Sequence, residues 1–284
     1  MTNTNHSICL EDKEYTRLSS FIVSQFGIKL PPNKKTLLQC RLQKRLKTLN
    51  HNSFKEYVDY VFSIKGLNEE VSNMIDAVST NKTDFFREPV HFSFLLEKGI
   101  GNYFEQTGKN KLSIWSAGCS SGEEPYSIAM VMKEYAAGNH QIDYNILATD
   151  ISNGVLQHAL VGIYTEEKSR VIPLDYKKKY LLKGKNDHEN KVRISSELRS
   201  KIDFRKFNLL SADYSHLGKF DIIFCRNVLI YFEREVQHRL LNQFCRSLNT
   251  GGYLFLGHSE SITGYSLPLK HILPTIFVKT GRAG

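Results

Sequence analysis

No stretch of the sequence approaches the roughly 18–20 consecutive apolar residues that a membrane-spanning helix requires. The strongest apolar runs, such as residues 228–232, have only the length of a strand. The chain begins Met-Thr-Asn-Thr-Asn-His, which is polar and uncharged and contains no apolar segment of the kind found in secretory signals. We therefore expect a cytoplasmic protein.

Cysteine is scarce, and no two cysteines are spaced as a metal-binding or redox pair. The five cysteines are spread from Cys9 to Cys245, and none forms a C-x-x-C motif. This spacing offers neither a structural zinc site nor a disulfide framework, and it suits a reducing compartment. We therefore expect no metal site.

Acidic residues are absent between Tyr15 and Lys55, a segment that contains nine basic residues. The whole chain has 38 Lys and Arg against 29 Asp and Glu, so the remainder of the chain is neutral. Within this segment, residues 36–49 place leucines on one side of a predicted helix and Arg41, Lys44 and Lys47 on the other. The local excess of positive charge predicts an acidic partner.

The periodicity of apolar residues divides the chain into three parts. Residues 1–80 show only helical patterns, and residues 81–109 are predicted to be a linker and a helix. From residue 110 to 284, short apolar runs alternate with helical patterns, which predicts a mostly parallel sheet of Rossmann-like α/β type covered by helices on both faces. Residues 163–200 depart from this pattern, being rich in charged and turn residues, and predict an inserted small β subdomain with a hairpin around Lys183–Lys191.

A glycine-containing loop follows the first predicted strand of the α/β part. Gly118 and Gly122 bracket this loop, and Asp150 ends the next strand. A strand, a glycine loop and a helix bring nucleotide-like ligands to the carboxyl edge of a parallel sheet, and an acid on the next strand can accept the ribose hydroxyls. The loop lacks both the Walker lysine and G-x-G-x-x-G. Tight packing for the loop and helix capping for Asp150 remain open, although Ser152 is available as the cap; together the features favour an adenosine-containing cofactor.

Four segments resemble the signature blocks of the chemotaxis receptor methyltransferases, the CheR family. They are residues 81–87 (Asn-Lys-Thr-Asp-Phe-Phe-Arg), 122–127 (Gly-Glu-Glu-Pro-Tyr-Ser), 224–232 (Phe-Cys-Arg-Asn-Val-Leu-Ile-Tyr-Phe) and 257–261 (Gly-His-Ser-Glu-Ser). The blocks occur in the family's order, and the resemblance covers nearly the whole chain. It implies an enzyme that transfers a methyl group from S-adenosylmethionine to glutamate side chains of chemotaxis receptors.

The resemblance also implies the residues of the site. The expected cofactor-binding residues lie in the linker, in the first loop and after the later strands: Asn81, Thr83, Arg87, Glu124, Asp150, Asn208, Leu209, Asn227 and Val228. Arg87 and Tyr231 are expected to handle the substrate carboxylate. A salt bridge of Arg87 with Glu88 or Asp84 and a core role for Tyr231 remain alternatives. For His258 and Glu260, a structural role in their loop is favoured over an acid–base pair.

The same resemblance implies the partners. Arg41, Lys44 and Lys47 are expected to contact the acidic cytoplasmic helices of receptors, and the enzyme is expected to be a monomer recruited to receptor arrays at the membrane. In some members of the family the inserted subdomain docks a receptor tether.

Two other functions are compatible with parts of the sequence. One is an RNA or DNA methyltransferase whose basic helix binds phosphates. Against it, no cysteine follows a proline, and residues 226–229 read Arg-Asn-Val-Leu where amino-methylating enzymes usually have an Asn/Asp-Pro-Pro-aromatic block. The other is a non-catalytic adaptor, which the complete set of cofactor residues disfavours. No nucleic acid is therefore expected among the partners.

Overall fold

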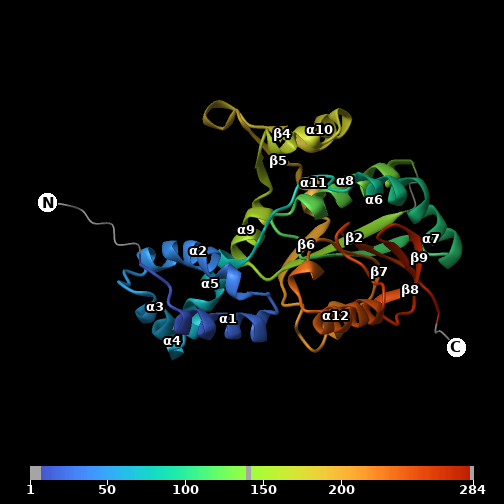
Figure 1. Cartoon of the computed structure of the whole chain (residues 1–284). Helices are drawn as coiled ribbons and strands as arrows, with labels where there is room; N and C mark the ends of the chain where they lie inside the picture. The colour runs from blue at the N-terminus through green and yellow to red at the C-terminus, as the bar shows by residue number, and fades with distance from the viewer. Residues whose placement is uncertain (1–7, 139–141, 282–284) are drawn as a thin grey trace. The chain divides into compact units, whose positions relative to one another are not determined.

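The chain divides into two units in the computed structural model, which describes residues 8–138 and 142–281 (Figure 1). The first unit contains the chain up to Thr80 together with Tyr231–Glu233, and the second contains Asn81–Ile230 and the residues from Arg234 onward. Within the described ranges no helix has both the length and the apolar character needed to cross a bilayer.

The first unit is all-helical. Its helices are α1 (Asp12–Phe26), the 3₁₀ turn η1 (Pro32–Lys34), α2 (Lys35–Thr48), α3 (Phe54–Val61), α4 (Ile64–Glu69) and α5 (Val71–Val78). The predicted leucine stripe of α2 forms its core, because Leu38, Leu42 and Leu46 are fully buried. Arg45 of the same helix forms an ion pair of 2.6 Å with the buried Glu70, whose carboxylate also accepts the hydroxyl of Tyr57 at 3.0 Å. The apolar stripe and this buried pair together fix the orientation of α2.

The second unit is built on a seven-stranded sheet of order β6-β2-β1-β7-β8-β10-β9. The strands are β1 (Lys111–Ala117), β2 (Asp143–Asp150), β6 (Ile202–Lys206), β7 (Phe220–Cys225), β8 (Leu248–Leu256), β9 (Leu269–Leu273) and β10 (Ile276–Lys279). The five strands from β6 to β8 are parallel, and β10 and β9 pair in antiparallel fashion at one edge. The confirmed fold class is therefore a mostly parallel α/β sheet with a separate helical N-terminal unit.

Helices cover both faces of this sheet, with α8 and α12 on opposite sides (Figure 1). Outside the inserted subdomain, the helices of the second unit are α6 (Pro89–Phe94), α7 (Ile100–Thr107), α8 (Glu123–Gly138), α9 (Asn153–Val161) and α12 (Arg234–Ser247). Three short turns accompany them: the π-helical turn η2 (Leu95–Gly99) and the 3₁₀ turns η5 (Ser215–Leu217) and η6 (Leu229–Tyr231), of which η6 ends in the first unit. Trp115 of β1 is fully buried against Phe244 of α12, with their rings 5.4 Å apart. The rings of Phe224 and Phe255 stack 4.3 Å apart on the neighbouring strands β7 and β8.

The inserted subdomain forms its own three-stranded antiparallel sheet of order β3-β5-β4. It comprises β3 (Ile163–Thr165), η3 (Lys168–Val171), α10 (Leu174–Tyr180), β4 (Leu181–Lys183), η4 (Asn186–His188), β5 (Lys191–Ile194) and α11 (Ser196–Arg199). The predicted hairpin is the β4–β5 pair, in which Lys183 lies opposite Val192. The insert also contacts the glycine loop, because the Tyr164 hydroxyl donates to the Ser121 carbonyl at 2.6 Å.

Candidate active site

The loops that carry the predicted site follow the carboxyl ends of neighbouring parallel strands. The register pairs Ala117 at the end of β1 with Thr149 of β2, and Cys225 at the end of β7 with Leu256 of β8. Because parallel strands end at the same edge of a sheet, the segments after β1, β2, β6, β7 and β8 line one edge. Such an edge is where open α/β sheets bind their ligands.

The glycine loop after β1 has a conformation that depends on its small residues. Gly118 and Gly122 have φ values of 82° and 96°, in the region that favours glycine. A Cβ added to Gly118 would lie 2.5 Å from a methyl carbon of Val228, so the glycine allows the loops after β1 and β7 to approach closely. The packing role left open by the sequence is therefore real at Gly118, and it brings Val228 to the glycine loop.

Asp150 connects the glycine loop to the tip of β2. Its carboxylate accepts the backbone N–H of Ser120 at 2.8 Å and that of Ser152 at 3.0 Å, and the residue is 8% exposed. Ser152, rather than Asp150, is the N-cap of α9, since its hydroxyl accepts the N–H of Val155. Two fixed donors orient the acid at the position expected for a ribose-binding carboxylate.

Asn208 and Leu209 follow β6 at the same edge. The side-chain oxygen of Asn208 accepts the N–H of Leu210 at 2.9 Å, which orders the turn. Leu209 is buried, and its carbonyl accepts the Tyr214 hydroxyl at 2.5 Å. This turn presents an apolar side chain and backbone groups, which are suitable contacts for a flat adenine ring.

The linker segment that contains Asn81, Thr83 and Arg87 is attached to the glycine loop and to α8. The carbonyl of Asn81 accepts the hydroxyl of Ser120 at 2.9 Å, and the N–H of Phe86 donates to Ser127 at 2.9 Å. Thr83 is half-buried in the same segment. The structure therefore places this segment, the glycine loop and Asp150 together.

Arg87 is half-buried and donates from its guanidinium to the carbonyl of Lys82 at 3.2 Å. In the described part of the chain it forms no ion pair, so the alternative of a salt bridge with Glu88 or Asp84 is not observed. Its neighbour Glu88 has a left-handed backbone, with φ 57°. Strained backbone of this kind is concentrated at functional sites.

Arg226 is the residue of this edge that the sequence analysis missed. Its guanidinium is almost fully buried and lies 3.4 Å from both Glu124 and Glu88, and it also donates to the carbonyl of Arg87. Burial raises the pKa of Glu124, against the opposing effect of Arg226 and of the Ser116 hydroxyl, which donates at 2.6 Å. An ion network of this kind fixes Arg87 and Glu124 relative to each other. The available signal was a charged residue directly after the apolar strand β7, since a buried charge must be paired.

Glu260 holds the loop after β7. Its carboxylate accepts the backbone N–H groups of Asn227, Val228, Leu229 and Gly257 at 2.6–2.9 Å. Burial raises its pKa, while these four donors act in the opposite direction. Asn227 is kept by this contact at a φ of 59°, with its side chain packed against Gly257. These are the contacts of a structural residue, as the sequence analysis favoured for Glu260.

Tyr231, the second residue expected to handle the substrate, groups with the first unit. Its carbonyl accepts the backbone N–H of Lys29 at 3.0 Å, and the adjacent Glu233 pairs with the side chain of Lys29 at 3.3 Å. The ring is partly exposed. Tyr231 is thus not a core aromatic.

The basic residues of the first unit differ in how they are used. Arg41 donates to the carbonyls of Val78 and Ser79 and to the hydroxyl of Thr80, so it holds the end of α5. Lys44 and Lys47 are exposed and have no ion-pair partner among the described residues. Five other basic residues of the segment pair with acids that lie outside it: Arg17, Lys29, Lys35, Arg45 and Lys55. The predicted basic face of α2 therefore consists of Lys44 and Lys47, while Arg41 has a structural contact.

The fold, the glycine loop and the acid at the tip of β2 define an α/β domain of the kind that binds an adenosine-containing cofactor, and the family match identifies it as an S-adenosylmethionine-dependent methyltransferase. Two family models match the chain: the CheR methyltransferase all-alpha domain over residues 13–79 and the CheR methyltransferase SAM-binding domain over residues 81–277. The chain belongs to the CheR methyltransferase family, and its cofactor is S-adenosylmethionine.

Relatives of this family match over most of their length. A chemotaxis protein methyltransferase of Borreliella burgdorferi is 40% identical over 279 residues, which is 97% of each chain. A chemotaxis protein methyltransferase of Klebsiella aerogenes is 38% identical over 90% of this chain and 86% of its own length. Chemotaxis protein methyltransferase 2 of Pseudomonas aeruginosa is 39% identical over 88% of this chain and 87% of its own length. These findings confirm the resemblance seen in the sequence, and they give no support to a nucleic-acid methyltransferase.

Proposed function

We propose that the enzyme converts glutamate side chains of methyl-accepting chemotaxis receptors into methyl esters during sensory adaptation. The observation that supports this most directly is the match to chemotaxis protein methyltransferases over almost the full length of the chain. The chemistry agrees, because a glutamate carboxylate with a reference pKa of about 4.3 is already ionised at neutral pH and needs no general base.

The residues of the carboxyl edge have distinct tasks in this reaction. S-adenosylmethionine supplies an activated methyl group on a sulfonium, and one carboxylate oxygen forms a bond to that carbon as the carbon–sulfur bond breaks. Asp150 and the glycine loop hold the ribose part of the cofactor, and Asn208 and Leu209 contact its adenine. Arg87, fixed through its carbonyl by Arg226, orients the carboxylate. A tight bidentate pair would stabilise the ground state, so the contribution of Arg87 is positioning.

The stability of the methylated product to alkali distinguishes an ester from other methylated groups. Purified receptor is incubated with the enzyme and methyl-labelled S-adenosylmethionine, and the labelled product is treated with alkali. An ester releases the label as methanol. Label that is stable to alkali, or that is transferred to RNA in preference to receptor, contradicts the proposal. Receptor in which the acceptor glutamates are replaced by alanine is the control and should stay unlabelled.

We also propose that the inserted subdomain docks a tethering segment of the receptor. In its sheet order β3-β5-β4, strands β3 and β4 are the edges, and an edge strand has unpaired backbone groups that an extended peptide can join. Leu174 and Leu182 are 65% and 59% exposed in the same subdomain. Deletion of the receptor's C-terminal tail should slow methylation; an unchanged rate and affinity would contradict tethering.

The receptor substrates also suggest where in the cell the enzyme acts and which of its surfaces meets the receptor. The enzyme acts as a monomer in the cytoplasm and is recruited to receptor arrays at the membrane, where Lys44 and Lys47 of α2 meet the acidic receptor helices. Arg41 supports this surface by holding the end of α5.

A further inference from the structure

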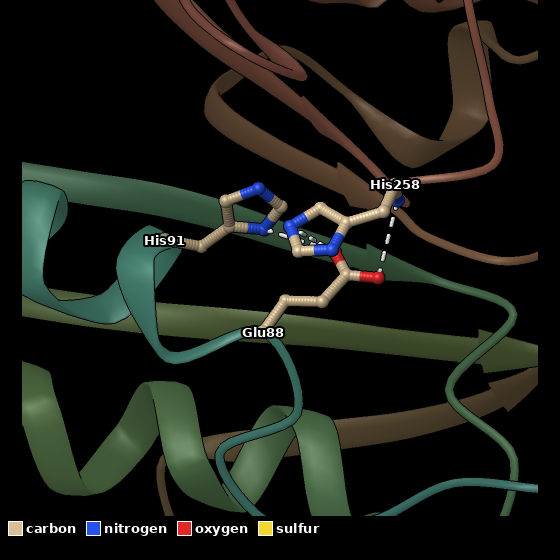
Figure 2. Close-up of side chains that lie close together, drawn as sticks. All are labelled: Glu88, His91 and His258. Atoms are coloured by element: carbon tan, nitrogen blue, oxygen red, sulfur yellow. Dashed lines mark hydrogen bonds and ion pairs between the residues drawn. The ribbon is translucent and has the colours of Figure 1, made fainter.

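Glu88, the residue that follows Arg87 in the sequence, forms a cluster with the side chains of His91 and His258 (Figure 2). Glu88 and His91 lie at the start of α6, and His258 lies in the loop after β8. The Oε2 atom of Glu88 is 3.6 Å from Nδ1 of His91 and 3.9 Å from Nε2 of His258. One potential ligand atom from each residue lies within 4.8 Å of the other two.

The hydrogen bonds of His91 determine which of its nitrogens carries the proton. The Thr275 hydroxyl donates to the carbonyl of Pro274 at 2.6 Å, so its oxygen must accept from Nε2 of His91, which is 2.8 Å away. The proton is therefore on Nε2, and Nδ1 carries a lone pair. This Nδ1 atom is buried and has no hydrogen-bond partner.

The position of this lone pair is unfavourable without a cation. It faces the carboxylate of Glu88, so two electron-rich groups meet in a site where the histidine is 1% and the glutamate 8% exposed. The guanidinium of Arg226 lies 3.4 Å from both Glu88 and Glu124, so one positive charge serves two carboxylates. A buried nitrogen lone pair that has no hydrogen-bond partner and faces a carboxylate is an arrangement that a bound cation would stabilise.

The geometry points to a binding site for one divalent transition-metal ion of the zinc class, formed by Glu88, His91 and His258. Two imidazole nitrogens and one carboxylate oxygen are the usual ligands of such an ion when a fourth position is left for water. Bonds of about 2.0–2.2 Å place tetrahedral ligands about 3.4 Å apart, close to the 3.6 Å between His91 and Glu88. His258 is 61% exposed and can turn to shorten its 3.9 Å separation.

The expectation that the chain has no metal site came from its cysteines, and it does not bear on this cluster. His258 is 170 residues from Glu88, so the linear sequence contains no spacing that unites the three. Only the fold brings the start of α6 to the loop after β8.

An ion bound at this site would affect methyl transfer through Arg226. This effect rests on the proposed function, but binding of the ion itself does not depend on that function. An ion bound to Glu88 competes with Arg226 for the carboxylate, and Arg226 also holds the carbonyl of Arg87. We expect the ion to inhibit methyl transfer by displacing Arg87.

The binding experiment uses the full chain with Cys9 and Cys40 replaced by serine, because both thiols are exposed and cysteine is itself a zinc ligand. Zn²⁺ is titrated by calorimetry, and Co²⁺ is followed by its visible absorption, which distinguishes nitrogen and oxygen ligands from thiolate. One ion per chain is expected. Even outer-shell partners of a ligand change metal affinity about 10- to 100-fold, so His258→Ala should weaken binding at least that much. His188→Ala, at an exposed histidine of the insert, is the matched control.

Two results would overturn the site. One is the absence of stoichiometric Zn²⁺ binding, and the other is a Zn²⁺ affinity in both His258→Ala and Glu88→Gln that equals that of the unsubstituted site. Thermal denaturation of each variant confirms that it is folded, and His258→Ala keeps the test valid if Glu88→Gln is unstable. Inhibition by Zn²⁺ that a chelator reverses and His258→Ala abolishes supports the link to Arg87. Unchanged activity of the zinc-loaded enzyme, with binding intact, overturns that link alone.

Discussion

At the scale of single residues, Asp150 is the side chain on which cofactor affinity should depend most. Its carboxylate is oriented by the N–H groups of Ser120 and Ser152. Asp150→Ala removes charge-assisted hydrogen bonds to the ribose and should cost about 2–3 kcal/mol of binding free energy, or roughly 30- to 150-fold in affinity. Calorimetric titration with S-adenosylhomocysteine measures this. Asp175→Ala, an exposed acid of the insert, is the control, and wild-type affinity in folded Asp150→Ala would exclude the ribose role.

Arg87 should matter for turnover more than for cofactor binding. In the described structure Nη1 of its guanidinium donates to the carbonyl of Lys82, so other donors of the planar fork remain for a substrate carboxylate. Arg87→Lys keeps the charge but loses the fork, and we expect it to lower kcat by at least about tenfold while changing cofactor affinity by less than about threefold. Steady-state kinetics and calorimetry on one preparation give both values. Normal turnover would mean that the carboxylate is held by another residue.

Glu260 should be essential for the loop that contains Asn227. A carboxylate only accepts hydrogen bonds, and this one accepts four backbone N–H groups; the amide of Glu260→Gln would place a donor against donors. We expect a loss of about 2–3 kcal/mol of unfolding free energy, measured by urea denaturation, together with weaker binding of S-adenosylhomocysteine. Glu235→Gln, exposed at the start of α12, should change neither. Wild-type stability in Glu260→Gln would show that the contacts are energetically minor.

At the scale of elements, the proposed recognition surface of α2 can be tested separately from the contribution of this helix to stability. Lys44→Glu with Lys47→Glu reverses two exposed charges and should weaken receptor binding on the order of tenfold, without changing the melting temperature. Arg41→Glu should instead lower the melting temperature, because Arg41 holds the carbonyls at the end of α5. Receptor pull-down and thermal denaturation distinguish the two effects.

The control for α2 is an equal change of charge elsewhere in the first unit, Lys13→Glu with Lys65→Glu, at two exposed positions. If this pair weakens receptor binding as much as the α2 pair, net charge rather than the α2 surface determines recognition. Methylation at the wild-type rate by the α2 pair would make that helix face merely solvated.

The elements that the sequence predicted well are those with strong apolar periodicity. Strand β7 is buried at all six positions and α2 has a clear leucine stripe, so both follow directly from the apolar pattern of the sequence. Strand β9 could not be predicted, because it lies at the sheet edge and four of its five residues are exposed, so its sequence has no apolar alternation. The π-helical turn η2 inside residues 89–107 also gives no distinct pattern, since it differs from an α-helix only in its hydrogen bonds.

The candidate site likewise contains residues that could be predicted from the sequence and contacts that could not. Asp150 and the glycine loop follow from local patterns at strand ends, and the remaining cofactor residues came from the family resemblance. The ion network of Arg226 with Glu88 and Glu124 could not be predicted, because it joins residues up to 138 positions apart through tertiary contacts. The loss of Arg41 from the basic face has the same cause, since helical spacing shows which side a residue faces and not which carbonyl it meets.

At the scale of the whole molecule, charge is balanced within the first unit far more than its basic segment suggests. The nine basic residues between Tyr15 and Lys55 are offset by acids on both sides, so residues 1–80 carry 11 basic and 8 acidic side chains. The net charge of +9 for the chain is therefore not concentrated in one large basic field. The proposed attraction to an acidic receptor surface would depend on a few exposed lysines such as Lys44 and Lys47, so we expect it to be modest and easily screened by salt.

Salt should weaken receptor recognition by the intact enzyme much more than it weakens cofactor binding. The screening length falls from about 10 Å at 0.1 M to about 3 Å at 1 M, which weakens contacts between exposed charges. Over this range we expect the KM for receptor to rise about 2- to 30-fold, the range for two exposed ionic contacts. Affinity for S-adenosylhomocysteine should change less than about twofold, because Asp150 and the Arg226 network are buried and screened little. Initial rates and calorimetry at matched salt test this, and the Lys44→Glu, Lys47→Glu enzyme should lose most of the salt dependence of KM. A salt response that persists unchanged in that variant would assign the electrostatic attraction to another surface of the chain.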